Sequence, residues 1–319
     1  MLNAFILIVI GFILLMGGAE YLVKGAVAIA SKLKIPTIIV GLTIVAFGTS
    51  TPEFVVSIKA ALNGSAGISV GNVIGSNIAN ILLILGITAL ISPIKCRRRI
   101  FLRDYRFLFI VSLLFSLFSL NGEIDTWQGI VFLIMLFGFI YHNYKNSSQE
   151  DITEEENSSI INSSWFNVVL ITLGGLIAIL YGADLLVRGA VNMARLLGVS
   201  EEIIGLTIIA VGTSLPELAT TVLATLRRQT GVALGNIVGS NIWNIVFIMG
   251  ATSTLTEVNV PKQFIYYDVW VMLFATIILF PAMMTRARLT RLEGFFFFVA
   301  YVAYIITQIL ISKGIWVIA

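Results

Sequence analysis

Long runs of hydrophobic residues, separated by short polar breaks, extend along almost the whole chain. An apolar run of about 20 residues is long enough to cross the hydrocarbon core of a bilayer as an α-helix. Ten such windows can be placed, with boundaries soft by a few residues. They cover residues 3–30, 35–62, 67–93, 101–120, 125–144, 165–196, 200–226, 230–255, 265–285 and 291–312. The pattern predicts an all-α polytopic membrane protein with ten transmembrane helices.

Composition supports this class. Of the 319 residues, 58% are hydrophobic and only 12% are charged, whereas soluble domains carry about 25% charged residues. The net charge of +3 does not indicate nucleic-acid binding, because basic residues beside membrane segments usually reflect topology. The single Cys96 excludes an internal disulfide and offers no metal cluster. The expected partners are the lipid bilayer and small inorganic cations, with no nucleic acid.

One clearly polar stretch, 146–164, divides the chain into halves at 1–145 and 165–319. It carries five acidic residues, at positions 150, 151, 154, 155 and 156. We interpret it as an exposed acidic linker, and a solvated run of charge is favoured over a regulatory cation site. The single His142, beside the linker, is expected to be a solvated interfacial residue.

The two halves are sequence repeats. An offset of 164 residues aligns 11–86 with 175–250 without a gap, and 23 of the 46 positions in 41–86 are identical to those in 205–250. A shared apolar composition could align Val with Ile by chance. It could not align rare polar motifs at one fixed offset, so the match indicates a true repeat. Because each half has five predicted helices, an odd number, the second copy enters the membrane from the opposite side. This predicts two inverted five-helix repeats, with a binding site at the midplane where they meet.

The distribution of Lys and Arg predicts the orientation. With the N-terminus outside, the inside loops hold Lys32, Lys34, Lys95, Arg97, Arg98, Arg99, Arg103, Lys145, Arg227, Arg228, Arg286, Arg288 and Arg291. The outside ends hold only Lys59, Arg195, Lys262 and Lys313. We therefore expect a multi-pass protein of the inner (plasma) membrane, with both termini outside and a cytoplasmic linker.

A short polar motif interrupts the apolar sequence at 48–53, Gly-Thr-Ser-Thr-Pro-Glu, and recurs at 212–217 as Gly-Thr-Ser-Leu-Pro-Glu. Proline has no backbone N–H and clashes with the preceding turn, so it breaks the core helix and frees carbonyl groups. A carboxylate within the membrane is unfavourable unless it faces a partner or a wet cavity. Free carbonyls, hydroxyls and an acid are the oxygen ligands that hard cations prefer.

Glu53 and Glu217 are the main candidates for ion binding, one from each repeat. Two such carboxylates repel each other in a dry core, and a divalent cation or several monovalent cations would relieve that repulsion. The penalty for an empty site would suppress movement of an unloaded carrier and favour antiport. The alternative is that each acid pairs with a buried base. Only Lys59 lies nearby in sequence, and Leu223 occupies the equivalent position.

The hydroxyls of Thr49, Ser50, Thr213 and Ser214 lie about one helical turn before the acids and can offer oxygen ligands. Alternatively, they bond back to carbonyls and bend the helices.

The amides of Asn80 and Asn244 follow a Gly-Ser pair and can also reach an ion, the alternative being an interhelical hydrogen bond. Asn77 and Asn241 recur too but lie about 300° away around a helix, so they rank lower. Four recurring glycines are expected to permit close helix approach and irregular backbone: Gly71, Gly75, Gly235 and Gly239.

Two further pairs, Glu20/Lys24 and Asp184/Arg188, have i, i+4 spacing. We interpret them as structural ion pairs near membrane ends, the alternative being an aqueous access path. The sequence contains no Gly-x-x-x-x-Gly-Lys-Ser/Thr loop, no Ser/His/Asp set and no His-rich motif. It predicts neither an ATP-driven pump nor an enzyme, and no organic cofactor.

At these motifs the chain resembles the sodium/calcium exchanger family. That family's alpha-repeats look like Gly-x-Thr-x-x-Ala-x-Gly-Thr-Ser-x-Pro-Glu followed by Gly-Asn-x-x-Gly-Ser-Asn-Ile-x-Asn/Asp, which correspond here to 41–53 with 71–80 and to 205–217 with 235–244. The resemblance implies a core of four helices, across which the long first and sixth helices slide, and exchange of several Na⁺ for one Ca²⁺ without ATP. It implies as ligands Glu53, Glu217, Thr49, Ser50, Thr213, Ser214, Ser76, Ser240, Asn80 and the carbonyls of Ala46 and Ala210.

One position departs from the archaeal and animal members, which usually carry Asp where this chain has Asn244. We keep Asn244 as a candidate ligand, but the change removes a titratable group and leaves the coupling ion open. Three hypotheses follow. The first is Na⁺/Ca²⁺ antiport by alternating access, by a chain expected to work as a monomer. The second is H⁺-coupled exchange of Ca²⁺ or another divalent cation. The third is a cation channel, which inverted copies within one chain disfavour.

Overall fold

The computed structural model describes residues 1–145, 163–197, 204, 208 and 210–316. The predicted acidic linker, 146–164, thus lies almost entirely outside the described residues. The described part consists of helices, four two-residue strands and the short connections between them.

The elements of the first half follow the apolar windows. A long helix comes first, and the following helix is broken and contains a π-helical turn. In order, they are α1 (Leu2–Leu33), α2 (Thr37–Val40), the π-helical η1 (Gly41–Val45), α3 (Ala46–Thr49), α4 (Thr51–Leu62), α5 (Ala66–Ile78), the π-helical η2 (Ala79–Ile84), α6 (Leu85–Ile91), β1 (Ile94–Lys95), α7 (Arg98–Ser119), β2 (Glu123–Ile124) and α8 (Thr126–Lys145).

The described elements of the second half follow the same order, offset by 163 to 167 residues. They are α9 (Trp165–Leu196), α11 (Ala210–Gly212), α12 (Leu215–Leu226), α13 (Thr230–Trp243), the π-helical η5 (Asn244–Met249), α14 (Gly250–Leu255), β3 (Val258–Asn259), the π-helical η6 (Phe264–Asp268), α15 (Val269–Arg286), β4 (Arg288–Leu289) and α16 (Arg291–Ser312). The strands pair antiparallel between the halves, β1 with β4 and β2 with β3.

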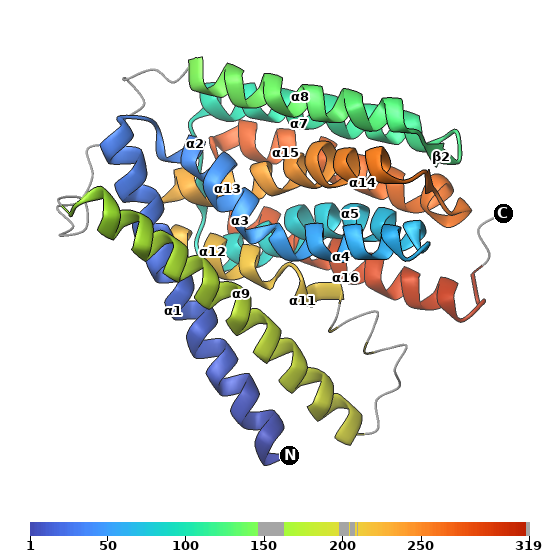
Figure 1. Cartoon of the computed structure of the whole chain (residues 1–319), viewed down its shortest axis with the longest axis horizontal. Helices are drawn as coiled ribbons and strands as arrows, with labels where there is room; N and C mark the ends of the chain where they lie inside the picture. The colour runs from blue at the N-terminus through green and yellow to red at the C-terminus, as the bar shows by residue number, and fades with distance from the viewer. Residues whose placement is uncertain (146–162, 198–203, 205–207, 209, 317–319) are drawn as a thin grey trace.

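Helices α1 and α9 form a long crossed pair that projects from one side of the bundle (Figure 1). Their backbones meet at glycines. A Cβ on Gly18 would lie 2.7 Å from the Gly175 carbonyl oxygen, and one on Gly182 would lie 2.5 Å from the Leu15 nitrogen. Small residues let membrane helices approach closely, which replaces the hydrophobic driving force that lipid does not supply. The outer faces of both helices expose large apolar side chains such as Phe12.

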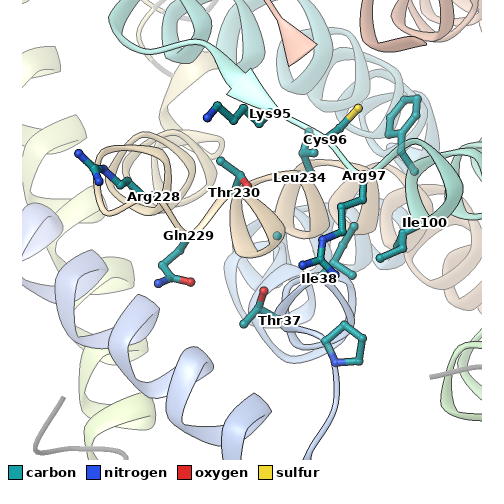
Figure 2. A pocket seen from close by; sticks show the side chains of 13 residues that line it. Thr37, Ile38, Lys95, Cys96, Arg97, Ile100, Arg228, Gln229, Thr230 and Leu234 are labelled. Carbon is teal, nitrogen blue, oxygen red and sulfur yellow. The ribbon is translucent and has the colours of Figure 1, made fainter. Parts of the chain in front are cut away.

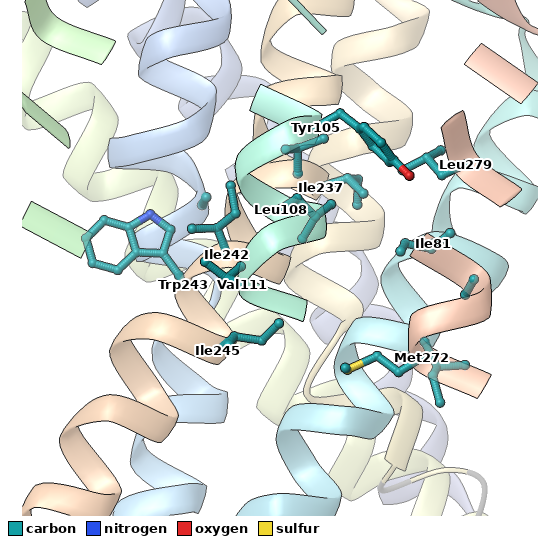
Figure 3. Packing of buried hydrophobic residues seen from close by; sticks show 14 of the residues in the cluster. Ile81, Tyr105, Leu108, Val111, Ile237, Ile242, Trp243, Ile245, Met272 and Leu279 are labelled. Atoms are coloured by element: carbon teal, nitrogen blue, oxygen red, sulfur yellow. The ribbon is translucent and has the colours of Figure 1, made fainter. Parts of the chain in front are cut away.

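The remaining helices pack around a large hydrophobic core, separate from the contact between α1 and α9, and both halves of the chain contribute to it. Figure 3 shows side chains of four elements in this core: Ile81 of η2, Leu108 of α7, Ile237 and Ile242 of α13, and Met272 of α15. This core surrounds α13, nearly all of which is buried. A central helix that does not contact lipid can carry polar side chains that face other protein groups. Polar residues within membranes usually lie in such interior positions.

Seven of the described helices are long and apolar enough to span a membrane, or eight if Thr37–Thr49 and Thr51–Leu62 count as one span bent by 46°. Two other helices fall outside this count for visible reasons. The first nine residues of α7 carry five charges, and α12 has only 12 residues. The predicted helix positions agree with these elements to within a few residues where the structure describes them.

Candidate functional site

The two broken helices place an acid at equivalent points. Ser50 and Ser214 are the N-cap residues of α4 and α12, and each is followed by a proline in the first turn and then by the acid. Because proline cannot continue the hydrogen-bond ladder, the chain bends here. Glu53 and Glu217 therefore sit in the first turns of their helices, where the positive end of the helix dipole favours a negative charge.

Glu53 and Glu217 lie in the interior, each 1% exposed, and close enough to repel each other when both are charged. Among the described residues, neither acid takes part in an ion pair with Lys or Arg. The Oε2 atom of each is buried without a hydrogen-bond partner. No cluster of three or more His, Cys, Asp and Glu occurs in the described part, so any further ligands would be neutral oxygens. Two buried acids without a basic partner are stabilised either by a proton or by a bound cation.

The hydroxyls of each motif face the acid of the other motif. The Ser50 hydroxyl donates a 3.0 Å hydrogen bond to Oε1 of Glu217. Thr213 and Ser214 lie against Glu53, although the Ser214 hydroxyl has no hydrogen-bond partner of ordinary geometry. The two broken helices are therefore interlocked, and the oxygens of both repeats gather in one place.

Two asparagines that the sequence analysis left out of the site hold this arrangement. The Asn72 amide donates to the Glu53 carbonyl at 3.0 Å and to the Ser57 hydroxyl at 2.9 Å. The Asn236 amide makes the equivalent bonds to the Glu217 carbonyl and the Thr221 hydroxyl, at 3.4 and 3.0 Å. Each asparagine ties a neighbouring helix to the backbone of an acid, as second-layer groups orient metal ligands.

Thr49 joins the same network. Its hydroxyl lies 3.1 Å from Oδ1 of Asn236 and 3.3 Å from the Ala46 carbonyl oxygen, and it can donate to either. The Ala46 carbonyl also accepts from the Ser50 backbone amide at 3.0 Å. This proposed carbonyl ligand is thus already engaged by the backbone of its own helix. Ala210, its counterpart, begins α11.

The predicted asparagine ligands lie in π-helical segments. Asn80 is in η2 and Asn244 begins η5, and both side-chain oxygens are buried without a partner. π-Helical turns are often found at functional sites, where they free backbone groups. The Asn244 amide donates to Oδ1 of Asn77 at 3.1 Å, so Asn77, which ranked lower, holds one of the candidates. Asn241 instead donates to its own helix.

Ser240 is fully buried with an unpartnered hydroxyl and lies against Glu217. Ser76 borders a cavity of about 800 Å³ that Thr213 and Asn72 also line. Gly75 lines the same cavity, and a Cβ there would meet no atom within 4 Å. The expectation that Gly75 permits close helix approach is therefore wrong. Gly235 and Gly239 do contact other helices, because they lie against η1 and α3.

Another buried acid that the sequence analysis did not single out contacts the wall of this cavity. Asp268, at the end of η6, accepts hydrogen bonds from Tyr304 at 2.9 Å, from Gln263 at 3.3 Å and from Gln308. Tyr304 and Gln308 line the cavity. Three neutral donors satisfy this carboxylate, and the network fixes α16 against the start of α15.

Both predicted ion pairs are present, and the acid of one pair, Glu20, also contacts a second base. Lys24 and Glu20 are 2.9 Å apart, and Arg188 and Asp184 are 2.9 Å apart. Glu20 also forms a fork-like pair with Arg227 at 2.7 and 2.9 Å. Glu20 belongs to α1 and Arg227 follows α12, so this ion pair connects the long helix pair to a core helix.

Comparison with known proteins identifies the family to which this chain belongs. The profile of the sodium/calcium exchanger protein family matches residues 3–145 and 167–310. The chain belongs to the sodium/calcium exchanger family. Its members are transporters of Na⁺ and Ca²⁺ and not enzymes, and this chain is accordingly a multi-span cation/Ca²⁺ antiporter of that family.

Three relatives match over nearly their full length. The chain is 37% identical to the putative antiporter CaxA of Alkalimonas amylolytica, with 95% of this chain and 98% of that protein covered. It is 32% identical to the sodium/calcium exchanger MaX1 of Methanosarcina acetivorans, covering 95% and 97%. A structure of the sodium-calcium exchanger NCX_Mj superposes with a TM-score of 0.84 at 29% identity, covering 96% and 99%. The family resemblance found in the motifs is confirmed.

Proposed function

We propose that this exchanger moves Ca²⁺ against Na⁺ through a single site formed by Glu53 and Glu217. The observation that carries the proposal is the burial of two acids without a basic partner, each faced by hydroxyls of the opposite motif. Ca²⁺ takes six to eight oxygen ligands. The two carboxylates, the hydroxyls of Thr49, Ser50, Thr213, Ser214, Ser76 and Ser240, and the amides of Asn80 and Asn244 provide enough oxygens for such a shell.

We further propose ten transmembrane segments in two inverted repeats, 1–145 and 165–319, joined by the linker at 146–164. The matching order and offset of the helices support this arrangement. All the proposed ligands come from one chain, so we propose that a monomer transports. The Lys and Arg distribution supports a plasma-membrane protein with both termini outside.

In that orientation the conformation is outward-facing. The 800 Å³ cavity extends from Ser65 and Pro261, in connections proposed to lie outside, to Thr213 and Ser76 beside the acids. On the opposite side α1 packs against α12 and α2. Alternating access would exchange these contacts between the two sides.

The function is tested by ⁴⁵Ca²⁺ uptake into proteoliposomes with Na⁺ and H⁺ gradients imposed separately. The proposal expects uptake that requires an outward Na⁺ gradient. Uptake driven equally well by a proton gradient without Na⁺ would instead establish the H⁺-coupled alternative. Uptake that continues with no counter-ion inside would indicate a channel.

The asparagine at position 244 gives a prediction about protons. Asn244→Asp adds a third carboxylate to the site, so one more proton competes with Ca²⁺ as the pH falls. As the pH falls below neutrality, Ca²⁺ uptake by this variant should decrease more steeply than uptake by the wild type. The extra decrease should approach about tenfold per pH unit, which is the maximum that one additional competing proton can cause. The measurement is initial uptake between pH 8 and pH 5.5. Asn63→Asp, at an exposed position, is the matched control and should keep the wild-type profile.

The ion pair between Glu20 and Arg227 gives a prediction about conformation. It connects α1 to α12 on the closed side, and residue 63, equivalent to Arg227 in the other repeat, is an asparagine. A partly exposed ion pair contributes about 0.5–1 kcal/mol, a two- to fivefold shift in an equilibrium. We expect Arg227→Gln to favour the inward-facing state. The half-saturating Ca²⁺ concentration should rise about two- to fivefold outside and fall inside.

The control for this prediction is Arg188→Gln, which breaks the intrahelical pair with Asp184. Ca²⁺ dependence is measured on both faces of oriented vesicles. Equal changes in the two variants, or a change of the same sign on both faces, would contradict a role for the Glu20–Arg227 pair in closure.

A further inference from the structure

Helix α13 runs between two polar regions of the protein. Its first residues, Thr230 and Gly231, line a cavity of about 80 Å³ beside Thr37 at the start of α2 (Figure 2). Its other end lies at the cation site, where the chain passes into the π-helical η5 at Asn244. Segment η5 packs against α4, which carries Glu53, and against α5. Asn244 therefore lies where the two repeats meet.

Asn77 of α5 fixes the side chain of Asn244 through its own orientation. The Nδ2 atom of Asn77 faces two acceptors, the backbone carbonyl oxygen of Asn241 at 3.4 Å and the sulfur of Met272 at 3.8 Å. Neither acceptor has a proton to donate, so the Asn77 amide has to turn its nitrogen toward them and its oxygen away. That oxygen, Oδ1, accepts a hydrogen bond from Nδ2 of Asn244 at 3.1 Å. The orientation of Asn77 thus determines that of Asn244.

The free group of Asn244 is consequently its oxygen. Asn77 and Asn244 are each 1% exposed, and Oδ1 of Asn244 is buried without a hydrogen-bond partner. A buried carbonyl oxygen without a partner is unfavourable, so this atom requires a ligand. Because the nitrogen is held by Asn77, Asn244 offers a neutral oxygen, which is a kind of ligand that hard cations prefer.

The same geometry disfavours an aspartate at position 244. Both oxygens of an ionised carboxylate accept hydrogen bonds and neither donates one. A carboxylate there would therefore place an acceptor against the Oδ1 acceptor of Asn77. If Asn77 reversed its amide to donate to the acid, its oxygen would face the Asn241 carbonyl instead. Either arrangement leaves two buried acceptors in contact.

The other repeat lacks this contact. At the offset of 164, Asn77 corresponds to Asn241 and Asn244 corresponds to Asn80. Asn241 donates to the Ile237 carbonyl of its own helix at 2.9 Å, and within the described part of the chain it makes no hydrogen bond to Asn80. The repeated motif therefore does not by itself produce the contact. Only Asn244 has its amide held by an asparagine of the opposite repeat.

We propose that Asn77 is a positioning residue, which fixes Asn244 as a neutral oxygen ligand and disfavours an ionised carboxylate at that position. The negative charge of the cation site then comes from Glu53 and Glu217 alone. This accounts for the departure at position 244, where archaeal and animal members of the family usually carry Asp. The inference rests on the proposed ion site, because Asn244 acts in transport only if it binds the cation there.

The test is a double-mutant cycle on equilibrium ⁴⁵Ca²⁺ binding to the full-length purified protein at pH 8. Asn77→Leu, which keeps the approximate size of the side chain and removes its hydrogen bonds, is made with Asn and with Asp at position 244. The matched control is Asn241→Leu, at an equally buried asparagine whose amide donates to its own helix. Glu53→Gln is the reference for loss of the site.

With Asn at position 244, Asn77→Leu should weaken Ca²⁺ binding about fivefold, the contribution of one hydrogen bond. Asn241→Leu should stay within about twofold of the wild type. With Asp at position 244, Asn77→Leu should leave binding unchanged or strengthen it, because it removes an opposing acceptor. Equal losses in the two backgrounds, or equal losses in Asn77→Leu and Asn241→Leu, would overturn the proposal.

The reference variant separates this inference from the proposed function. If Glu53→Gln abolishes binding while Asn77→Leu binds Ca²⁺ like the wild type, the ion site stands and the role of Asn77 is refuted. If Glu53→Gln leaves binding unchanged, both are refuted. Folding of each variant is checked by size-exclusion chromatography and by its unfolding temperature. If Asn77→Leu does not assemble, Asn77→Ala makes the same comparison, and equal losses in both backgrounds would again contradict the proposal.

Discussion

Replacing either Glu53 or Glu217 by glutamine is expected to abolish Ca²⁺ uptake. Glutamine keeps the size of the side chain but removes one of the two charges that balance a divalent ion. Removing one partner from a buried charged arrangement costs about 3–5 kcal/mol, which corresponds to at least about a hundredfold loss of affinity. Each single variant should therefore lose both equilibrium ⁴⁵Ca²⁺ binding and Na⁺-driven uptake. The double variant should be no worse, because a single loss already disables the site.

The matched control is Glu257→Gln, which neutralises an exposed acid. This variant should retain wild-type uptake and binding. If both single variants, Glu53→Gln and Glu217→Gln, retain wild-type Ca²⁺ binding, the two acids do not form the ion site. This conclusion holds whether or not the variants still transport Ca²⁺.

A second large effect is expected at the contact between α1 and α9. Gly18→Ala places a methyl group 2.7 Å from the Gly175 carbonyl oxygen and from the Ile179 nitrogen, both backbone atoms that cannot move independently. Overpacking of this kind costs about 1–3 kcal/mol. We expect a lower unfolding temperature and impaired uptake, because the two long helices can no longer pack at their present distance.

The neighbouring Gly17 is a control within the same helix, since a Cβ there meets nothing within 4 Å. Gly17→Ala should unfold at the wild-type temperature or slightly above it, because alanine stabilises a helix relative to glycine. If Gly17→Ala and Gly18→Ala unfold alike, backbone contact at Gly18 does not determine the packing of the two helices.

Much of the fold follows from the sequence because lipid imposes simple rules. Apolar runs must be helical, so their bounds could be located to within a few residues. The break at Pro52 follows from the missing N–H of proline. The repeat follows from a fixed offset that needs no structural information. Gly75 shows the limit of this reasoning, since a glycine in a repeated motif can border a cavity as well as a helix contact.

The partners of individual polar groups could not be predicted. Sequence spacing placed Ser50 one turn before Glu53, yet its hydroxyl bonds to Glu217 of the other motif. Likewise, the spacing paired Glu20 with Lys24 alone. In the structure Glu20 also contacts Arg227, which lies some 200 positions away in sequence. Such contacts depend on how the halves dock, which the periodicity of one helix does not encode. Asn72 and Asn236 recur beside the motif glycines, and that recurrence was the available signal for their role.

The most direct test of the shared ion site is anomalous diffraction from crystals soaked with Sr²⁺, a heavier analogue of Ca²⁺. We predict one strong peak between the side chains of Glu53 and Glu217, with oxygens of both carboxylates about 2.3–2.6 Å from the metal, slightly longer for Sr²⁺. A peak that contacts only one of the two acids, or none between them at saturating Sr²⁺, would contradict it.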